Sequence, residues 1–174
     1  MATSVELIDE MNYQSQHFDY EEDSFDSDDE VDRTKFVIGM RVFRGPFWQW
    51  GDQDHFNDQP GGGIIIAICD DSGDGDDLVT VQWDNGQKGN YQIGSHRELS
   101  LPSNCDEIIK LLTPGQQVVR GPDWKWRGQD SSSSGTVVEL DHTKPGWVVV
   151  EWHRSGKTNS YRVGYRGMFD LSAR

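Results

Sequence analysis

The chain has 174 residues, a net charge of −14, and 11% aromatic residues. Twelve carboxylates and no Lys or Arg fall within residues 1–32, so the remaining residues sum to only about −2. That near-neutral part lacks the basic stripe of nucleic-acid-binding domains, and no stretch approaches the ~20 apolar residues of a membrane span. We therefore expect neither nucleic-acid binding nor membrane insertion.

Two further features indicate the cellular compartment. Cys69 and Cys105 are too few to form a disulfide framework, which favours a reducing environment. The N-terminus has no apolar run of the kind found in signal peptides. We expect an intracellular, cytoplasmic protein.

Residues 1–34 are acidic and poor in aliphatic side chains, a composition that buries too little apolar surface to fold. We predict a disordered acidic tail. Within it Ser27 lies among carboxylates, with Glu30 three positions later, and acid-directed phosphorylation there would add negative charge. The alternative is a solvating tail without modification.

From Phe36 onward the chain consists of short alternating or apolar runs separated by Gly, Pro, Asp and Asn, a pattern typical of small all-β domains. The candidate strands of a first domain, residues 35–101, are 41–44, 63–68, 78–83 and 89–93. Residues 70–77 alternate oxygen-bearing side chains as calcium loops do, but Val81 stands where an EF-hand requires Glu. We predict an acidic hairpin loop there.

Residues 102–112 form a short apolar linker, in which 106–112 predicts one or two helical turns and a fixed orientation of the flanking domains. The candidate strands of a second domain, residues 113–174, are 117–120, 135–140, 147–152 and 159–163. Turn chemistry at 84–86 and 154–156 predicts a hairpin between the third and fourth strands of each domain. Strands this short and bent usually close into a small SH3-like barrel.

The two domains are copies of one module. Residues of the first copy recur in the second at a constant offset of 76 positions. In the first copy they are Gly39, Val42, Arg44, Gly45, Pro46, Trp48, Trp50, Gln53 and Asp54, and in the second they are Gly115, Val118, Arg120, Gly121, Pro122, Trp124, Trp126, Gln129 and Asp130. After a gap the match resumes with offsets of 69 to 72, which indicates loop insertions within one fold. Duplication of a small module favours paired binding surfaces, because avidity gains from it whereas a catalytic centre gains little.

One segment recurs at residues 44–54 and 121–130, and in the second copy it is followed by Gly135-Thr136-Val137, Val150-Glu151-Trp152 and residues 159–164. With these residues the sequence resembles a Mind bomb/HERC-type domain, in two copies that span about four fifths of the chain. The first copy differs by Phe47 in place of Asp123, by an insertion at 55–62, and by lacking Asn-Ser before its tyrosine. The resemblance implies SH3-like barrels and a role in large ubiquitin ligases, where such domains recognise the protein to be ubiquitinated. In the Mind bomb ligases a pair of them engages the cytoplasmic tails of Notch ligands. The zinc finger, ankyrin array and RING or HECT domain of those ligases are not present in this sequence.

The repeated Trp-x-Trp-x-x-Gln-Asp element carries the candidate binding residues. Paired indoles after a Gly-Pro turn can form the floor of a peptide groove, although one ring of each pair is expected to fill the core. The Gln-Asp pairs suit hydrogen bonds that lock the following loop or contact a ligand. The arginines can stack on tryptophan or pair with a carboxylate, and the tyrosines suit a groove wall or a buried hydrogen bond. The predicted peptide-binding set is Trp48, Trp50, Gln53, Asp54, Tyr91, Arg120, Trp124, Trp126, Gln129, Asp130 and Tyr161.

No hydrolase, kinase or zinc-ligand spacing occurs in both modules, so we expect no catalytic residues, no metal and no cofactor. The leading prediction is a non-catalytic recognition protein that binds a linear peptide or tail of a protein partner, with ubiquitin-ligase machinery as its context. Two alternatives stay open: the substrate-binding part of a ligase whose transfer domain lies elsewhere, and a reader of methylated lysine.

Overall fold

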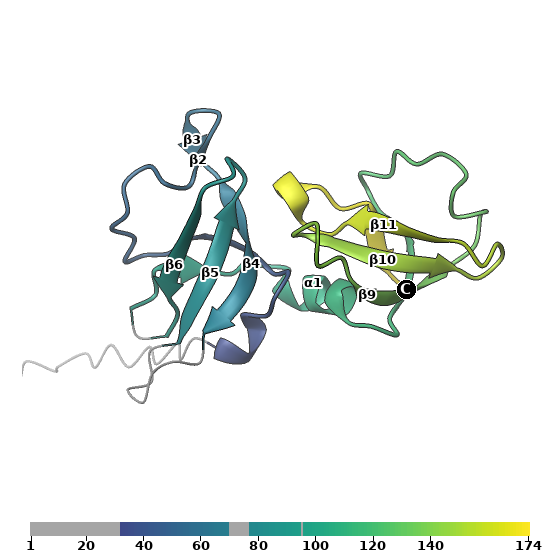
Figure 1. Ribbon diagram of the computed structural model, residues 1–174, viewed down its shortest axis with the longest axis horizontal. Helices are drawn as coiled ribbons and strands as arrows, with labels where there is room; N and C mark the ends of the chain where they lie inside the picture. Colours follow the sequence, from purple (N-terminus) through teal and green to yellow (C-terminus); the bar gives the residue numbers. More distant parts are fainter. Residues whose placement is uncertain (1–31, 70–76, 95) are drawn as a thin grey trace, which may run out of the picture.

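The computed structural model describes residues 32–69, 77–94 and 96–174, in which two antiparallel five-stranded sheets are joined by one α-helix (Figure 1). The predicted all-β class is confirmed. The predicted tail up to residue 31, its Ser27 site and residues 70–76 of the acidic loop lie outside the described residues. No helix in the described ranges is long and apolar enough to cross a membrane.

The first unit, residues 32–101, contains one sheet of order β6-β5-β4-β1-β7. Its strands are β1 (Arg41–Arg44), β4 (Gly62–Cys69), β5 (Leu78–Trp83), β6 (Lys88–Gln92) and β7 (Leu99–Ser100). A 3-10 helix, η1 (Arg33–Lys35), precedes the sheet, and the insertion forms a small hairpin of β2 (His55–Phe56) and β3 (Gln59–Pro60).

The second unit, residues 113–174, repeats this topology in the order β11-β10-β9-β8-β12. Its strands are β8 (Gln117–Arg120), β9 (Gly135–Leu140), β10 (Trp147–Trp152), β11 (Thr158–Arg162) and β12 (Leu171–Ala173), with a 3-10 helix, η2 (Tyr165–Gly167), before the last strand. The eight strands and both hairpins expected from the alternation pattern are present. The sequence pattern did not indicate β7 and β12, because two or three residues are too few to show a period.

Both sheets are bent at the same position. Ile66 in β4 and Val138 in β9 are extra residues without a partner in the neighbouring strand, so the register shifts there. A bulge of this kind bends its strand and increases the local twist. Each sheet therefore curls around the tryptophan and valine side chains on its inner face.

The expectation of closed barrels is corrected by the strand pairing. In the described residues no ladder joins the sheet edges β6 and β7. These edges meet where Glu98 N–H donates to the Gln92 carbonyl at 3.3 Å and the Glu98 carboxylate accepts from Gln92 N–H at 2.7 Å. Asp170 and Arg162 make the same reciprocal contacts in the second unit, at 2.9 and 3.0 Å. Because β7 and β12 are so short, these contacts, with an isolated bridge between Val163 and Phe169 in the second unit, do not extend into a closing ladder.

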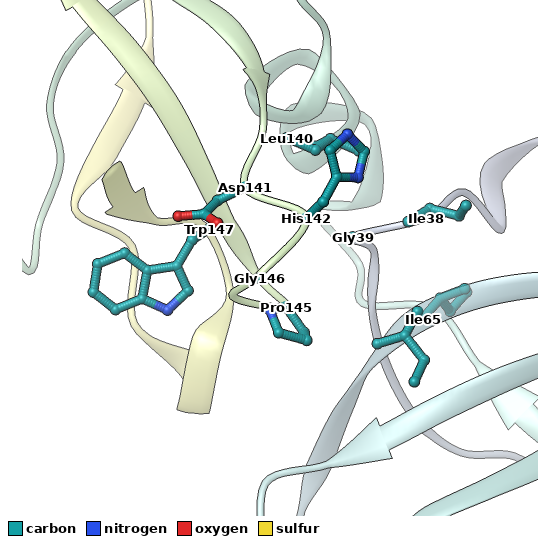
Figure 2. A pocket seen from close by; sticks show the side chains of 10 residues that line it. Ile38, Gly39, Ile65, Leu140, Asp141, His142, Pro145, Gly146 and Trp147 are labelled. Carbon is teal, nitrogen blue, oxygen red and sulfur yellow. The ribbon is translucent and has the colours of Figure 1, made fainter. Parts of the chain in front are cut away.

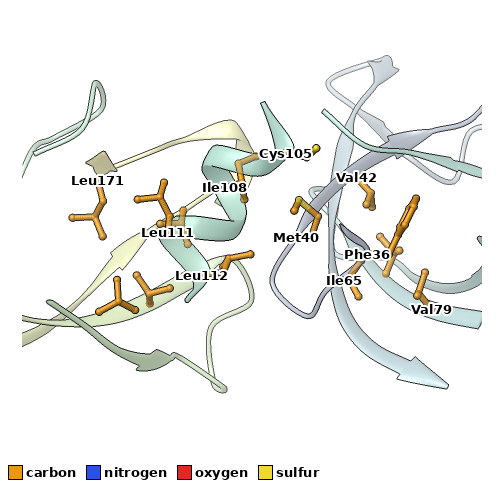
Figure 3. Close-up of a cluster of buried hydrophobic side chains, with 14 of the residues drawn as sticks. Phe36, Met40, Val42, Ile65, Val79, Cys105, Ile108, Leu111, Leu112 and Leu171 are labelled. Atoms are coloured by element: carbon orange, nitrogen blue, oxygen red, sulfur yellow. The ribbon is translucent and has the colours of Figure 1, made fainter. Parts of the chain in front are cut away.

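Helix α1 (Cys105–Leu112) shares its apolar face between the two units (Figure 3). Cys105, Ile108, Leu111 and Leu112 are buried, at the spacing that places residues on one face of a helix. They belong to one continuous core with the inner faces of both sheets, and Figure 3 shows α1 between Met40 and Leu171. The two units thus have a joint core and a defined relative orientation.

A buried ion pair forms a second link between the units. The Arg41 guanidinium donates to the Asp84 carboxylate at 2.6 and 3.1 Å and to the Gly164 carbonyl of the second unit at 2.8 Å. Both charged side chains are less than 10% exposed. A Cβ at position 62 would lie 2.3 Å from the guanidinium, so any larger residue there would displace Arg41 from this pair.

Candidate functional site

The loop after the first strand of each unit holds the repeated tryptophans, and a glycine turn starts it. Gly45 N–H donates to the Glu98 carbonyl at 2.7 Å, and a Cβ at Gly45 would lie 2.0 Å from the Arg97 carbonyl oxygen. A Cβ at Gly121 would lie 2.6 Å from backbone atoms of Leu171. This close approach explains why Gly-Pro recurs in both copies.

The first tryptophan of each pair packs onto the core. The Trp48 ring stacks on Tyr91 with centroids 5.3 Å apart and meets Trp83 edge-on at 5.4 Å. Its Nε1–H donates to the Gly51 carbonyl at 2.7 Å. Trp124 repeats each contact with Tyr161, Trp152 and the Arg127 carbonyl, at 5.3, 5.6 and 2.9 Å. Two sets of contacts that agree this closely show that the element has one architecture in both units.

The tyrosine hydroxyl links this packing to the loop. Tyr91 is buried, and its hydroxyl accepts from Trp83 Nε1–H at 2.7 Å and donates to Gln53 Oε1 at 2.9 Å. Burial raises the pKa of Tyr91 above its ordinary value. Tyr161 has the same position and the same shift, and it donates to Gln129 Oε1 at 3.1 Å. Both tyrosines and both glutamines therefore hold the loop against the sheet, and contact of these side chains with a peptide stays a prediction.

An arginine-aspartate pair closes the loop. Arg120 donates twice to the Asp130 carboxylate at 2.6 Å, and its guanidinium lies over the Trp124 ring at 5.4 Å. The hydrogen bond from Arg120 lowers the pKa of Asp130 below its ordinary value. Arg44 makes the same bidentate pair with fully buried Asp54. This geometry assigns the four charged residues a loop-anchoring role.

The second tryptophans differ between the units. Trp126 is partly buried and contacts Trp147 and Tyr161, with ring centroids 6.2 and 6.0 Å apart. Its Nε1 is buried without a hydrogen-bond partner among the residues that the structure describes. Trp50 is 39% exposed, and the strand position that corresponds to Trp147 is the smaller Leu78. One indole of the first unit is thus available to a ligand.

A cavity beside Trp48 gives the first unit a candidate binding site. Its volume is about 380 Å³, and it is lined by Phe47, Trp48, Gln49, His96 and Glu98, which we call the aromatic cavity. Phe47 is 62% exposed. The buried Glu98 carboxylate accepts from Gln49 Nε2 at 3.0 Å, so the cavity combines aromatic walls with a held negative charge.

Of these five lining residues, only Trp48 belongs to the set predicted from the sequence. The available signal was the difference between the copies at position 47. Asp123, its counterpart, accepts from Phe169 N–H at 2.7 Å, whereas Phe47 is largely exposed to solvent. Glu98 and its counterpart Asp170 were not recognised, because a carboxylate before a very short strand has no distinctive pattern.

A crevice between the units is too small to be a ligand site. Figure 2 shows Ile38 and Ile65 of the first unit facing Pro145 and His142 of the second, while Trp147 points away from them. The enclosed volume is about 70 Å³, enough for only a few water molecules. We interpret it as a packing gap at the junction. Across the described ranges, no group of three or more His, Cys, Asp or Glu side chains could hold a metal ion.

Comparison with known proteins gives concordant matches. The family model Mib_herc2 matches the chain twice, at residues 39–102 and 115–174. The chain is similar to the E3 ubiquitin-protein ligase MIB2 of Gallus gallus, 28% identical over 216 residues that cover 77% of this chain and 22% of that protein. It is also similar to the E3 ubiquitin-protein ligases Ufd4 of Drosophila melanogaster, 43% identical over 63 residues, and HERC2 of Homo sapiens, 40% identical over 76 residues. These two matches cover 36% and 42% of this chain and 2% of each relative. The chain therefore spans less than a quarter of the length of these relatives.

Proposed function

The chain belongs to the Mib_herc2 family, as its repeated residue pattern predicted, and from that premise we propose that it binds a linear segment of a partner protein for ubiquitination. Three relatives are named E3 ubiquitin-protein ligases. The parts of this chain that the family model matches are its two Mib_herc2 domains. Transfer of ubiquitin is assigned to domains outside the matched region. The chain itself recognises the segment and catalyses nothing.

The observation that carries this proposal is the aromatic cavity with Phe47 exposed at its wall. Exposed aromatic side chains beside a cavity are the surface on which binding energy is usually concentrated, because they give large contact area at low entropic cost. Trp50 adds a second exposed ring in the same loop. A stack anchored on Tyr91 holds Trp48 in position before a ligand arrives.

The chemistry of the cavity indicates which residue it accepts. Glu98 is negative and buried, and Phe47 and Trp48 present ring faces. A lysine or arginine side chain can lay its aliphatic stem along the rings and direct its charge toward the carboxylate. We therefore propose a segment with a basic residue. Two aromatic rings beside a carboxylate also suit methylated lysine, which is the second candidate.

Phe47→Asp is the sharpest test, because it installs the residue that the second unit carries at this position. Phe47 is mostly exposed, so the fold should tolerate the change. Peptides selected from a random twelve-residue display library on the full chain would be measured by fluorescence anisotropy. We expect Phe47→Asp to weaken binding by about tenfold or more, as for an interface hot spot. Met168→Ala, an exposed apolar residue of the second unit, is the matched control.

The outcomes separate the alternatives. Equal affinity of the wild type and Phe47→Asp would remove the aromatic cavity from recognition. A trimethyl-lysine version of the selected peptide that binds about tenfold tighter than the unmodified one would favour the methyl-lysine reader. Purified chain incubated with E1, E2 and ubiquitin should form no conjugates, and conjugate formation would contradict the non-catalytic assignment.

A further inference from the structure

The second unit contains an open pocket whose cluster of arginines is not repeated in the sequence of the first unit. It has a volume of about 540 Å³ and is bordered by Arg120, Arg154 and Arg174 together with the hydroxyls of Ser132, Ser133 and Ser134, and we call it the basic pocket. The positions that correspond to Arg154 and Arg174 in the first copy are Asn85 and Pro102. The shared fold therefore does not require this cluster of arginines.

Two of the three guanidinium groups have no carboxylate side chain as a partner among the described residues. Arg120 is paired in bidentate fashion with Asp130, the one carboxylate side chain that lines the pocket. Arg154 donates to the Ser131 carbonyl at 3.1 Å, and Arg174 donates to Ser134 Oγ at 3.2 Å. Within the part of the chain that the structure describes, no carboxylate side chain lies within ion-pair distance of Arg154 or Arg174. The side chains of the pocket thus present two positive charges.

The serine loop is arranged around these charges. Ser133 Oγ donates to the Asp130 carbonyl at 2.9 Å and accepts from Arg154 N–H at 3.4 Å, which joins the loop to the β10–β11 turn. Ser132 is exposed, so its hydroxyl is accessible from the pocket. The Arg154 and Arg174 guanidinium groups and the Ser132 hydroxyl border one space, and proteins use such groups of donors to bind multi-oxygen anions.

We propose that the basic pocket binds a phosphorylated serine or threonine of a partner protein. A phosphate monoester carries nearly two negative charges and three acceptor oxygens, which match the two guanidinium groups without a carboxylate partner and the exposed Ser132 hydroxyl. A carboxylate offers one charge and would neutralise only one arginine. A nucleic-acid phosphodiester also carries one charge, and the net charge of −14 opposes a long polyanion.

The proposal is tested by titrating the full chain with a seven-residue glycine-rich peptide that carries one central phosphoserine. Nitrogen-15 spectra of the arginine side chains would follow the binding. We expect the Nε–H signals of Arg154 and Arg174 to shift with the phosphoserine peptide but not with its serine version, and to shift less with the glutamate version. Arg154→Gln with Arg174→Gln should weaken binding by about tenfold or more, since each removes charge-assisted hydrogen bonds. Lys157→Gln, an exposed cation outside the pocket, should leave it unchanged.

Four results would overturn the inference. The first is equal affinity for the serine and phosphoserine peptides, and the second is a set of Nε–H shifts confined to arginines other than Arg154 and Arg174. The third is an affinity for a ten-nucleotide single-stranded RNA that exceeds the affinity for the phosphoserine peptide. The fourth is an affinity for inorganic phosphate as high as that for the phosphoserine peptide. Because Arg154 and Arg174 are exposed, their replacement should not unfold the chain. Phe47→Asp should leave phosphopeptide binding intact, so failure here is distinguishable from failure of the aromatic cavity.

Discussion

Removing Asp84 should cost far more stability than removing an exposed carboxylate, because it would leave the Arg41 charge buried and unpaired. Asp84 is 7% exposed and Arg41 9% exposed, so both groups have lost most of their water. Breaking such a buried pair from one side costs about 3–5 kcal/mol. A domain of this size is typically stable by only about 5–15 kcal/mol, so Asp84→Ala should remove a large share of the free energy of unfolding.

Urea unfolding followed by tryptophan fluorescence would measure the effect. Asp106→Ala is the matched control, because Asp106 pairs with Lys35 at 3.0 Å but is 71% exposed, and we expect a loss below about 1 kcal/mol. The double variant Arg41→Met with Asp84→Leu removes both charges and should lie within about 2 kcal/mol of the wild type. If Asp84→Ala is no worse than Asp106→Ala, or if the double variant is as unstable as the single one, the argument from desolvation is wrong.

Three further changes test other parts of the fold. Tyr161→Phe should cost about 1–3 kcal/mol in urea unfolding, because Trp152 Nε1–H loses its buried acceptor; no loss would mean that this bond is not needed. Burial acts to raise the pKa of Asp141, but hydrogen bonds from Thr143 and Ser160 together outweigh it and lower this pKa to about 2. The stabilisation from ionised Asp141 is therefore present above about pH 4 and lost as pH falls toward 2. Asp141→Asn should reduce this loss of unfolding free energy at acid pH by at most about 2 kcal/mol, and calorimetry at several pH values would detect the difference. Gly135→Ala should lower the melting temperature, since its Cβ would lie 2.6 Å from a Val150 methyl carbon. Gly128→Ala should leave the melting temperature unchanged, because its Cβ would meet no atom within 4 Å, and equal effects of the two variants would contradict the packing argument.

The sheets could be predicted because each strand carries its own local signal. In Leu78–Trp83 and Trp147–Trp152 every second residue is buried, a set that consists of Val79, Val81, Trp83, Val148, Val150 and Trp152, and these strands form as expected. Closure of the barrel could not be predicted, because it depends on how two distant edges meet. The described residues show only reciprocal contacts at Glu98 and Asp170 and an isolated Val163–Phe169 bridge between these edges, and no ladder.

Of the five residues that line the aromatic cavity, the sequence predicted only Trp48. The repeat indicated Trp48, Trp50, Trp124 and Trp126 as a group, but exposure depends on partners far away in sequence. Trp147 packs on Trp126, and the corresponding position in the first unit is Leu78. Such a difference arises from tertiary contacts, and the local pattern of Trp-x-Trp is identical in both copies.

The apolar face that α1 shares between the units has a consequence for the length of a bound partner segment. Because both sheets pack on the same eight-residue helix, the separation between the aromatic cavity and the basic pocket is set before anything binds. A partner that places a basic residue and a phosphoserine on one chain gains from both only when the intervening spacer spans that separation. With a matched spacer the second contact forms at an effective concentration in the millimolar range, and with a spacer too short to reach it does not form at all.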